Sequence, residues 1–330
     1  MPVILGIESS CDDTAAAVLV DGYVRSNIIA NQEVHKHYGG VVPELAARAH
    51  LQHIIPVVDQ ALDKANIDKK EVNAVAYTLG PGLMGSLLVA NSFAKSLAMS
   101  LEVPLIEVNH MQAHLLVHFE KSTPNPSFPF LGLTVSGGHT QLVLVTAPDQ
   151  MKVIGQTLDD AIGEAFDKAG KMLGLPYPAG PYIDHYAQRG TPNIPFSIPK
   201  VPDLDFSFSG FKTNVLYFLR KQQELDKNFI TDQRNNLCAS IQSTLLRIVM
   251  EKLEKAVDQT GVNQIVLGGG VSANSGLRKA LAKRKEWNVF IPPLTFTTDN
   301  AAMIAVAGHF KYQHNHFGKL TSQSQSRMSL

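Results

Sequence analysis

The chain has 330 residues, of which 45% are hydrophobic, and this length favours about two domains. Its 29 basic and 29 acidic residues cancel, which excludes a molecule-wide positive field for nucleic acid and leaves only local basic patches for that purpose. Its two cysteines, Cys11 and Cys238, lie far apart in the sequence, which excludes a disulfide framework and favours a reducing compartment.

The first residues and the apolar segments predict a cytoplasmic protein. Residues 1–13, MPVILGIESSCDD, lack a basic start and reach two aspartates early, unlike a signal peptide. The longest apolar tract, 83–108, is interrupted by Lys95, Glu102 and Pro104. We therefore expect no membrane span and no membrane partner.

The elements expected in chain order repeat once. The first half predicts strands at 3–7, 15–20 and 23–30, a polar turn at 9–14, a helix at 50–65, and a strand, glycine turn and helix start at 72–86. The second half predicts strands at 130–135, 140–146 and 151–157, a turn at 136–139, a helix at 241–259, and a strand, glycine turn and helix start at 262–276. This repeat predicts duplicated α/β domains that face a central cleft.

The polar segment 120–128, EKSTPNPSF, predicts the link between the two lobes. The lobes are then expected at 1–125 and 126–330, with an insertion around 160–215 in the second. The last helix is a candidate to return to the first lobe. The Ser- and Gln-rich tail after Lys319 is expected to be frayed.

Two histidines one helical turn apart are the most informative chemical feature. His110 and His114 share one helix face, and a distant carboxylate such as Asp299 can complete a three-ligand metal site with them. The alternatives are two packed histidines and an aspartate that caps the following helix. Zinc proteases place a glutamate base directly after the first histidine, where this chain has Met111. A metal here is therefore expected to hold a substrate rather than to drive proteolysis.

Four glycine turns at strand ends have the composition of phosphate-binding loops. They span 6–14, 79–86, 135–141 and 267–274. Glycine allows close approach of the backbone, whose N–H groups bind anionic oxygens. None of the turns has the Walker A pattern. Two such turns in each half favour a nucleotide site, beside which Asn274 either contacts the ligand or caps a helix.

Nine motifs occur in one order between residues 6 and 306: GIESSCDDTAAAVL, GGVVPELAARAH, GPGLMGSLLVA, NHMQAH, VSGGHTQL, GEAFDKAGKMLGLPYPAGP, FSFSGFKT, GGGVSAN and TDNAAMIA. In them the chain resembles bacterial members of the universal tRNA threonylcarbamoyladenosine synthesis family, formerly described as glycoproteases. The resemblance covers nearly the whole chain and implies the actin/hexokinase/Hsp70-like ATPase fold. It also implies an acyltransferase that moves a threonylcarbamoyl group from threonylcarbamoyl-adenylate to N6 of adenosine 37 in tRNAs reading ANN codons, the t6A modification.

The resemblance assigns roles by position. It implies that His110, His114 and Asp299 hold one divalent metal ion, and two imidazoles with a carboxylate suit Fe²⁺ or Zn²⁺. It implies an adenylate site, which ATP or ADP can also occupy, formed by Thr134, Val135, Ser136, Gly137, Gly138, Asp167, Gly180, Asp184 and Asn274. The chain departs from the usual bacterial pattern at Asp13, where Glu is common, and at Ala179, where Gly is common.

The reaction needs orientation and charge stabilisation more than an enzyme nucleophile, because the donor is already activated. Asp12 is the candidate to take or position the proton of the incoming amine, and Asp13 is a second candidate. Either can instead be a turn residue. His139 is a candidate to orient the phosphate turn, and Cys11 is expected to be a packed small residue rather than a nucleophile.

Two basic groups are candidates for the tRNA surface. One contains Arg278, Lys279, Lys283, Arg284 and Lys285 beside Trp287, and its alternative is a solvated helix end; the other contains His35, Lys36, His37 and Arg48. The resemblance further implies a TsaB-like paralogue and a TsaE-like ATPase as partners, with a separate threonylcarbamoyl-adenylate synthase upstream.

Three other functions remain in competition. An actin-fold small-molecule kinase would explain the glycine turns but not the two histidines with Asp299. A metalloprotease is disfavoured by the missing glutamate. A nucleotide-dependent scaffold that clamps a partner would have no use for a tightly held transition metal.

Overall fold

The computed structural model describes residues 1–330, apart from the side chain of Lys36, as two compact units. Unit 1 comprises Met1–Pro126, Pro148–Met151 and Pro292–Leu330, and unit 2 comprises Ser127–Ala147 and Lys152–Ile291. The last segment of the chain therefore belongs to unit 1. Among the described helices, none combines the length and the apolar character that crossing a membrane requires.

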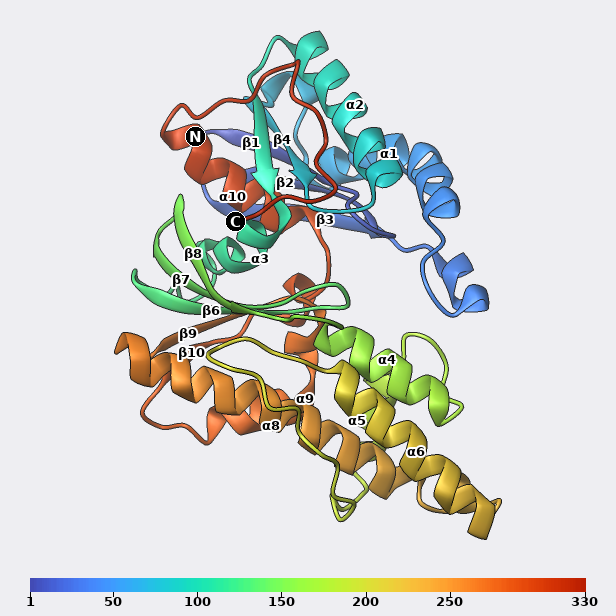
Figure 1. The fold of residues 1–330 in the computed structure, drawn as a ribbon. Coiled ribbons are helices and arrows are strands. Elements are labelled where there is room, and N and C mark those ends of the chain that lie inside the picture. Colours follow the sequence, from blue (N-terminus) through green and yellow to red (C-terminus); the bar gives the residue numbers. More distant parts are fainter. The chain divides into compact units, whose positions relative to one another are not determined.

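The sheet of unit 1 has five strands in the order β3-β2-β1-β4-β5 (Figure 1). They are β1 (Val3–Glu8), β2 (Thr14–Val20), β3 (Tyr23–Ala30), β4 (Ala74–Gly80) and β5 (Leu105–Asn109). The central strand β1 pairs antiparallel with β2 and parallel with β4. β1, β2 and β4 are buried along their whole lengths, as expected for strands covered on both faces.

Helices cover both faces of this sheet. Ile4 and Leu5 point to opposite faces, because successive side chains of a strand alternate. Leu5 packs with α1 (Pro43–Ala65) and α2 (Met84–Leu101), and Ile4 packs with α3 (His110–Leu116) and α10 (Ala301–Gln313). α10 approaches β1 so closely that a Cβ on Gly6 would lie 2.5 Å from the carbonyl oxygen of Ala301. Only glycine fits at that position.

The sheet of unit 2 repeats this plan in the order β10-β9-β6-β7-β8. Its strands are β6 (Phe130–Val135), β7 (Thr140–Ala147), β8 (Gln150–Gln156), β9 (Gln264–Gly268) and β10 (Asn288–Phe290). The central strand β6 pairs antiparallel with β7 and parallel with β9, as β1 does with β2 and β4. The predicted duplication is confirmed.

Among the described residues, unit 2 has six α-helices. They are α4 (Ile162–Met172), α5 (Gly180–Ala187), α6 (Ser209–Leu225), α7 (Phe229–Asp232), α8 (Arg234–Thr260) and α9 (Ser275–Ala282). α8 begins earlier than the helix expected at 241–259, and α1 begins earlier than the one expected at 50–65, with Pro43 at its first position. Short 3₁₀ helices lie at Glu33–Tyr38, Lys69–Glu71, Val117–Phe119, Gly270–Ala273 and Leu294–Phe296.

The tail after Lys319, which the sequence suggests is frayed, is instead held against unit 1. The backbone N–H of Gln325 donates to the carbonyl of Leu79 at 2.9 Å, and Nδ2 of Asn109 donates to the carbonyl of Ser329 at 3.0 Å. The prediction was wrong because it rested on polar composition. Serine and glutamine lack apolar surface, but their backbone groups bind the ends of β4 and β5 just as well.

Candidate functional site

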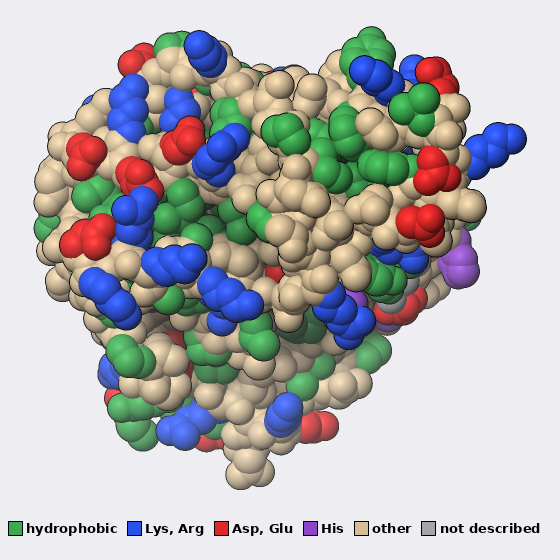
Figure 2. Space-filling view, turned by 90° about the horizontal axis from the view of Figure 1, so that it is seen from below, with side chains coloured by type: hydrophobic (Ala, Val, Ile, Leu, Met, Phe, Trp, Pro, Cys, Tyr) green, Lys and Arg blue, Asp and Glu red, His purple; other side chains and the backbone are tan. Residues whose placement is uncertain are grey.

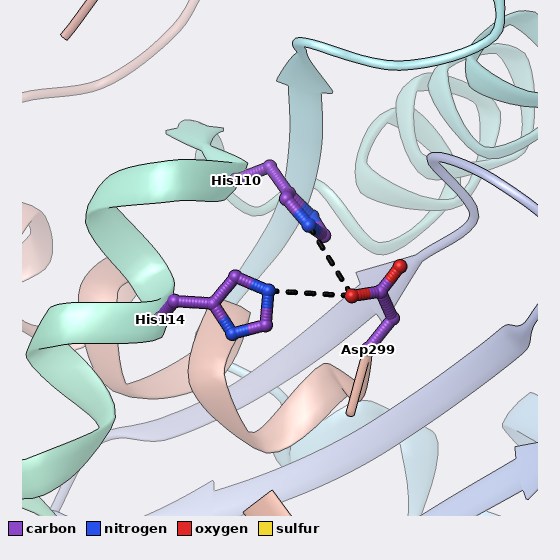
Figure 3. Close-up of side chains that lie close together, drawn as sticks. All are labelled: His110, His114 and Asp299. Carbon is purple, nitrogen blue, oxygen red and sulfur yellow. Dashed lines mark ion pairs between the residues drawn. The ribbon is translucent and has the colours of Figure 1, made fainter. Parts of the chain in front are cut away.

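The three residues predicted as metal ligands lie together in unit 1, with their side chains pointing toward one another (Figure 3). Nε2 of His110 lies 3.4 Å from Oδ1 of Asp299, and Nε2 of His114 lies 3.2 Å from the same oxygen. One ligand atom from each residue lies within 4.8 Å of the others. Two imidazole nitrogens and a carboxylate that converge in this way form a donor set for a divalent transition metal.

Both histidines are positioned by the helix that follows β5 directly. Asn109 is the last residue of β5, and its Oδ1 accepts hydrogen bonds from the backbone N–H groups of Met111 at 2.9 Å and Gln112 at 3.2 Å. This cap starts α3 immediately after the strand. His110 and His114 then lie one turn apart on the same face of α3.

Asp299 is not the cap of α10, although the sequence allows that interpretation. The cap is Asn300, whose Oδ1 accepts a hydrogen bond from the backbone N–H of Met303 at 3.0 Å. The carboxylate of Asp299 precedes the cap and faces the histidines instead. The helix-cap alternative for Asp299 is therefore wrong, and the donor set keeps its acidic member.

The surroundings of His114 show that a bound cation would fit at this site. The residue is 1% exposed, and no described residue makes a hydrogen bond with either nitrogen of its ring. Nε2 faces Asp299 at 3.2 Å but without the geometry of a hydrogen bond. Buried polar atoms without partners are costly. A metal ion bound by Nε2 would remove that cost for this atom, so the residues present fit the metal that the sequence predicts.

Glu8, which sequence reasoning missed, touches this cluster. It is the last residue of β1 and is fully buried. Its Oε2 lies 2.9 Å from Nδ1 of His110 and accepts a hydrogen bond from Oγ1 of Thr78 at 2.6 Å. Its Oε1 accepts a short hydrogen bond from the backbone N–H of Ser10. The sequence signal was a carboxylate at the end of an otherwise apolar strand.

The charges of this cluster shift one another's pKa values. Burial opposes protonation of His110, but the carboxylates of Glu8 and Asp299 raise its pKa well above the ordinary value. Burial lowers the pKa of His114. Burial also opposes the charge on Glu8 and Asp299, yet His110 beside them holds the pKa of each carboxyl below its ordinary value. A metal ion that binds here must therefore displace a proton from His110.

The loop between β1 and β2 carries the two candidate proton acceptors, Asp12 and Asp13. The carbonyl of Cys11 anchors the loop, because it accepts hydrogen bonds from Nε2 of His50 at 3.0 Å and Oγ of Ser86 at 2.9 Å. Burial and the neighbouring Asp12 carboxylate raise the pKa of Asp13 to about 8. Burial likewise raises the pKa of the Cys11 thiol far above its ordinary value. A thiol that resists ionisation is a poor nucleophile, which agrees with the packed interpretation of Cys11.

The residues predicted to bind the adenylate all belong to unit 2. Thr134 and Val135 end β6, Ser136, Gly137, Gly138 and His139 form the turn to β7, Asp167 lies on α4, Gly180 and Asp184 lie on α5, and Asn274 precedes α9. Hydrogen bonds and close backbone packing join these segments to one another. The predicted set therefore forms one connected group within unit 2.

The turn after β6 is held by hydrogen bonds to Ser136 and leaves open space beside its two glycines. Oγ of Ser136 accepts hydrogen bonds from the backbone N–H groups of His139 at 3.0 Å and Gly138 at 3.3 Å. A Cβ on Gly137 or Gly138 would meet no protein atom within 4 Å. The buried hydroxyl of Thr134 has no hydrogen-bond partner among the described residues. This turn thus has open space beside its two glycines, and the strand that leads into it carries a hydroxyl without a partner among the described residues.

The carboxylates of Asp167 and Asp184 already accept hydrogen bonds from other groups of the protein. Oδ1 of Asp167 accepts a hydrogen bond from the backbone N–H of Ala179 at 2.7 Å, and burial raises the pKa of Asp167. Asp184 accepts hydrogen bonds from the backbone N–H of Ser275 at 3.1 Å and from its Oγ at 2.8 Å. Each carboxylate has further lone pairs, which ribose hydroxyls could use.

Asn274 is the N-cap of α9. Its Oδ1 accepts a hydrogen bond from the backbone N–H of Leu277 at 3.0 Å, and its Nδ2 donates to Oε1 of Gln242 at 2.7 Å. Nearby, Gly269 adopts φ +89°, and a Cβ there would lie 2.5 Å from the carbonyl oxygen of Val135. The glycine turn after β9 therefore packs directly on the end of β6, which brings Asn274 to the same region.

The first candidate basic group is partly engaged within the protein. Arg284 pairs with Glu254 and lies over the ring of Trp287, 5.5 Å from its centroid. Nε of Arg278 donates to the carbonyl of Ser272 at 2.8 Å. The face shown in Figure 2 carries many Lys and Arg side chains, with Asp and Glu side chains among them. Because acidic side chains lie among the basic ones, the positive electrostatic potential of this face is weaker than that of a continuous basic surface.

The second candidate basic group is smaller than the sequence suggests. His35 is 1% exposed, and its Nε2 lies 2.8 Å from Oε1 of Gln32. It therefore belongs to the interior and not to a tRNA-facing patch. His37 and Arg48 are exposed, while the side chain of Lys36 lies outside the described residues.

Comparisons with known proteins agree on one family. Residues 23–306 match the TsaD family, described as tRNA N6-adenosine threonylcarbamoyltransferase. A relative of that name from Christiangramia forsetii is 59% identical, with 98% of this chain and 97% of the relative covered. Another of the same name from Riemerella anatipestifer is 54% identical, with 99% and 98% covered.

Solved structures share the fold at low identity. Full-length HypF, in a phosphate- and nucleotide-bound form, matches with a TM-score of 0.62 at 13% identity, over 96% of this chain and 47% of that one. Component A of (R)-2-hydroxyglutaryl-CoA dehydratase from Acidaminococcus fermentans matches with a TM-score of 0.55 at 15% identity, over 93% and 96%. The expected two-lobed, actin/hexokinase/Hsp70-like ATPase fold is confirmed. The family match and the two relatives, each spanning most of the chain, establish that it belongs to the TsaD family of tRNA N6-adenosine threonylcarbamoyltransferases.

Proposed function

We propose that this chain transfers the threonylcarbamoyl group of threonylcarbamoyl-adenylate to N6 of adenosine 37 in tRNAs that read ANN codons. The observation that carries this proposal is the convergence of His110, His114 and Asp299 in a chain of this family. A small-molecule kinase would not need such a donor set. A metalloprotease would need a glutamate base where Met111 stands.

One divalent ion per chain, Fe²⁺ or Zn²⁺, would be held by Nε2 of His110, Nε2 of His114 and the carboxylate of Asp299. When bound, this ion would supply Lewis-acid polarisation and orientation of the threonylcarbamoyl end. The protein's own part is to hold the three donors ready. Both histidines are buried, which limits the access of water to their ring nitrogens.

Transfer forms a bond from N6 of the adenosine to the carbamoyl carbon and breaks the bond from that carbon to the phosphate oxygen of AMP. One proton must leave N6. Asp12 is the proposed acceptor and Asp13 the second candidate, because in the metal-free chain burial and the Asp12 carboxylate raise the pKa of Asp13 to about 8, which favours the protonated form of Asp13. Hydrogen bonds from His50 and Ser86 to Cys11 hold the loop that carries Asp12.

The adenylate, or ATP and ADP in its place, is proposed to bind in unit 2. The open backbone of Gly137 and Gly138 would approach the phosphate, and His139 would orient that turn. Asp167 and Asp184 would accept hydrogen bonds from the ribose. Val135, Gly180 and Asn274 would line the same site, and the unused hydroxyl of Thr134 would gain a partner.

The proposed partners are tRNA, a TsaB-like paralogue, a TsaE-like ATPase and an upstream threonylcarbamoyl-adenylate synthase, all in the cytoplasm. An apolar surface supports a protein partner. Leu51 and Ile55 lie one turn apart on α1 and are 65% and 58% exposed, and Met84 and Leu88 lie one turn apart on α2 and are 44% and 50% exposed. These side chains lie on two helices that pack on each other, and exposed apolar side chains of neighbouring helices are a kind of surface that protein partners cover.

The test is single-turnover transfer from preformed threonylcarbamoyl-adenylate to an ANN-decoding tRNA transcript, with the partner proteins present. The parent chain should form t6A. Asp12→Asn should keep its fold and slow transfer by about 10²–10⁴-fold. A variant rate within about threefold of the parent would reduce Asp12 to a turn residue. ADP production from ATP and small acceptors, without t6A, would favour the kinase instead.

A further inference from the structure

We infer that Glu8 is a positioning residue for the proposed metal site, which it serves by fixing the ring of His110. This inference rests on the proposed binding of a metal by His110, His114 and Asp299. Glu8 itself is not one of these three donors. Its role follows from where its carboxylate lies and from what occupies each of its oxygens.

The position of Glu8 calls for an explanation. It ends β1, the central strand of unit 1, and has no exposed surface. A carboxylate is expensive to bury unless charged or hydrogen-bonding partners surround it. Strand β1 is otherwise apolar, so the fold alone would be served better by a hydrophobic residue there.

Each oxygen of Glu8 has a defined partner. Oε1 accepts from the backbone N–H of Ser10, and Oε2 accepts from the hydroxyl of Thr78 at 2.6 Å. These two bonds fix the plane of the carboxylate. The remaining lone pair of Oε2 then points to Nδ1 of His110, at 2.9 Å. Both oxygens of the carboxylate are therefore held by hydrogen bonds that do not involve His110.

The bond to Glu8 decides which nitrogen of His110 can bind a metal. Nδ1 carries the hydrogen that it donates to Glu8, so Nε2 is the nitrogen left to act as a ligand, and it faces Asp299. The hydroxyl of Ser10 also lies near Nδ1, at 3.2 Å, but the shorter and charged contact is the stronger. A carboxylate behind a metal-binding histidine fixes the ring's tautomer and orientation in just this way.

The test measures metal binding of the full chain rather than its activity. Chelator-treated protein would be titrated with Zn²⁺ against a competing chelator, and with Co²⁺ to follow the absorption bands of the bound ion. The parent should bind about one ion per chain. Glu8→Gln, which keeps the shape of the side chain but not its charge, should weaken binding by about 10–100-fold and shift the Co²⁺ bands.

Glu120 offers a matched control in the same unit. It is 2% exposed and accepts hydrogen bonds from the backbone N–H groups of Val24 at 3.1 Å and Ser122 at 3.0 Å, neither of which belongs to the proposed metal site. Glu120→Gln should therefore alter stability but leave metal affinity within about threefold of the parent. In an already weakened His110→Ala chain, the Glu8→Gln change should have no further effect on metal affinity, because the two residues act together.

Three outcomes would overturn the inference. Unchanged metal affinity and Co²⁺ bands in Glu8→Gln would make the carboxylate purely structural. Equal weakening in Glu8→Gln and Glu120→Gln would attribute the effect to general loss of stability. A parent chain that binds no metal would overturn the proposed metal site itself, and so is distinguishable from the first two. If Glu8→Gln does not fold, Glu8→Asp, which draws the carboxylate back from Nδ1, carries the same expectation.

Discussion

Replacing Asp13 by asparagine should make the stability of the metal-free protein less dependent on pH. Burial, together with the carboxylates of Asp12, Asp299 and Glu8, raises the pKa of Asp13 from 3.8 to about 8. The unfolded chain releases this proton near pH 3.8, whereas the folded chain keeps it until about pH 8. The contribution of Asp13 to stability is thus fully present below pH 3.8 and is lost as the pH rises to about 8.

The size of the effect follows from the width of that window. Within it the unfolded state binds one proton fewer, so the free energy of unfolding falls by about 1.4 kcal/mol per pH unit. Between about pH 5 and about pH 7 this group would lower the stability of the parent by about 2.7 kcal/mol. This is an upper value, because Asp13 is partly exposed and solvent screens its charge. The asparagine side chain of the variant is uncharged at every pH. Over the same pH range, the free energy of unfolding of the variant should therefore fall by about 2.7 kcal/mol less than that of the parent.

Urea unfolding at the two pH values, with a chelator present, measures this difference. The matched control is Asp59→Asn, which removes an exposed carboxylate from α1 and should leave the pH dependence of the parent intact. If Asp13→Asn and the parent lose stability in parallel, to within about 0.5 kcal/mol, Asp13 does not keep a proton at neutral pH. The proposal that Asp12 accepts the proton of the amine would then lose its main support over Asp13.

Three further predictions concern the metal site and the packing of unit 1. Asp299→Asn should abolish the metal content found by elemental analysis and should also lower the melting temperature of the chelator-treated protein, because the charged His110 loses one of its two carboxylate partners; full metal content would remove Asp299 from the site. Gly6→Ala should lower the free energy of unfolding by about 1–3 kcal/mol, because its Cβ would meet the carbonyl of Ala301; unchanged denaturant midpoints would show that α10 moves aside easily. Deleting the tail after Lys319 should speed hydrogen exchange at the ends of β4 and β5, and unaltered exchange would mean that the tail binds only weakly.

The sequence by itself determined the architecture of each unit and the family. Apolar runs such as 3–7 and 130–135 must be buried, and turns separate them in the same order twice, so the duplication could be read from local pattern alone. The sequence also predicted that His110 and His114 lie side by side, because residues one turn apart on a helix share a face whatever surrounds the helix. Asp299 was found through its motif rather than through any physical rule.

Only the tertiary structure decided which polar groups meet. Glu8 and His110 are separated by 102 positions and touch because β1, β4 and β5 lie side by side. The roles of Asp299 and its neighbour Asn300 were indistinguishable in sequence, since either can cap a helix, and the start of α10 assigned the cap to Asn300. The tail after Lys319 looked unstructured for the same reason: hydrogen bonds between distant segments depend on where backbones meet, and composition does not encode that.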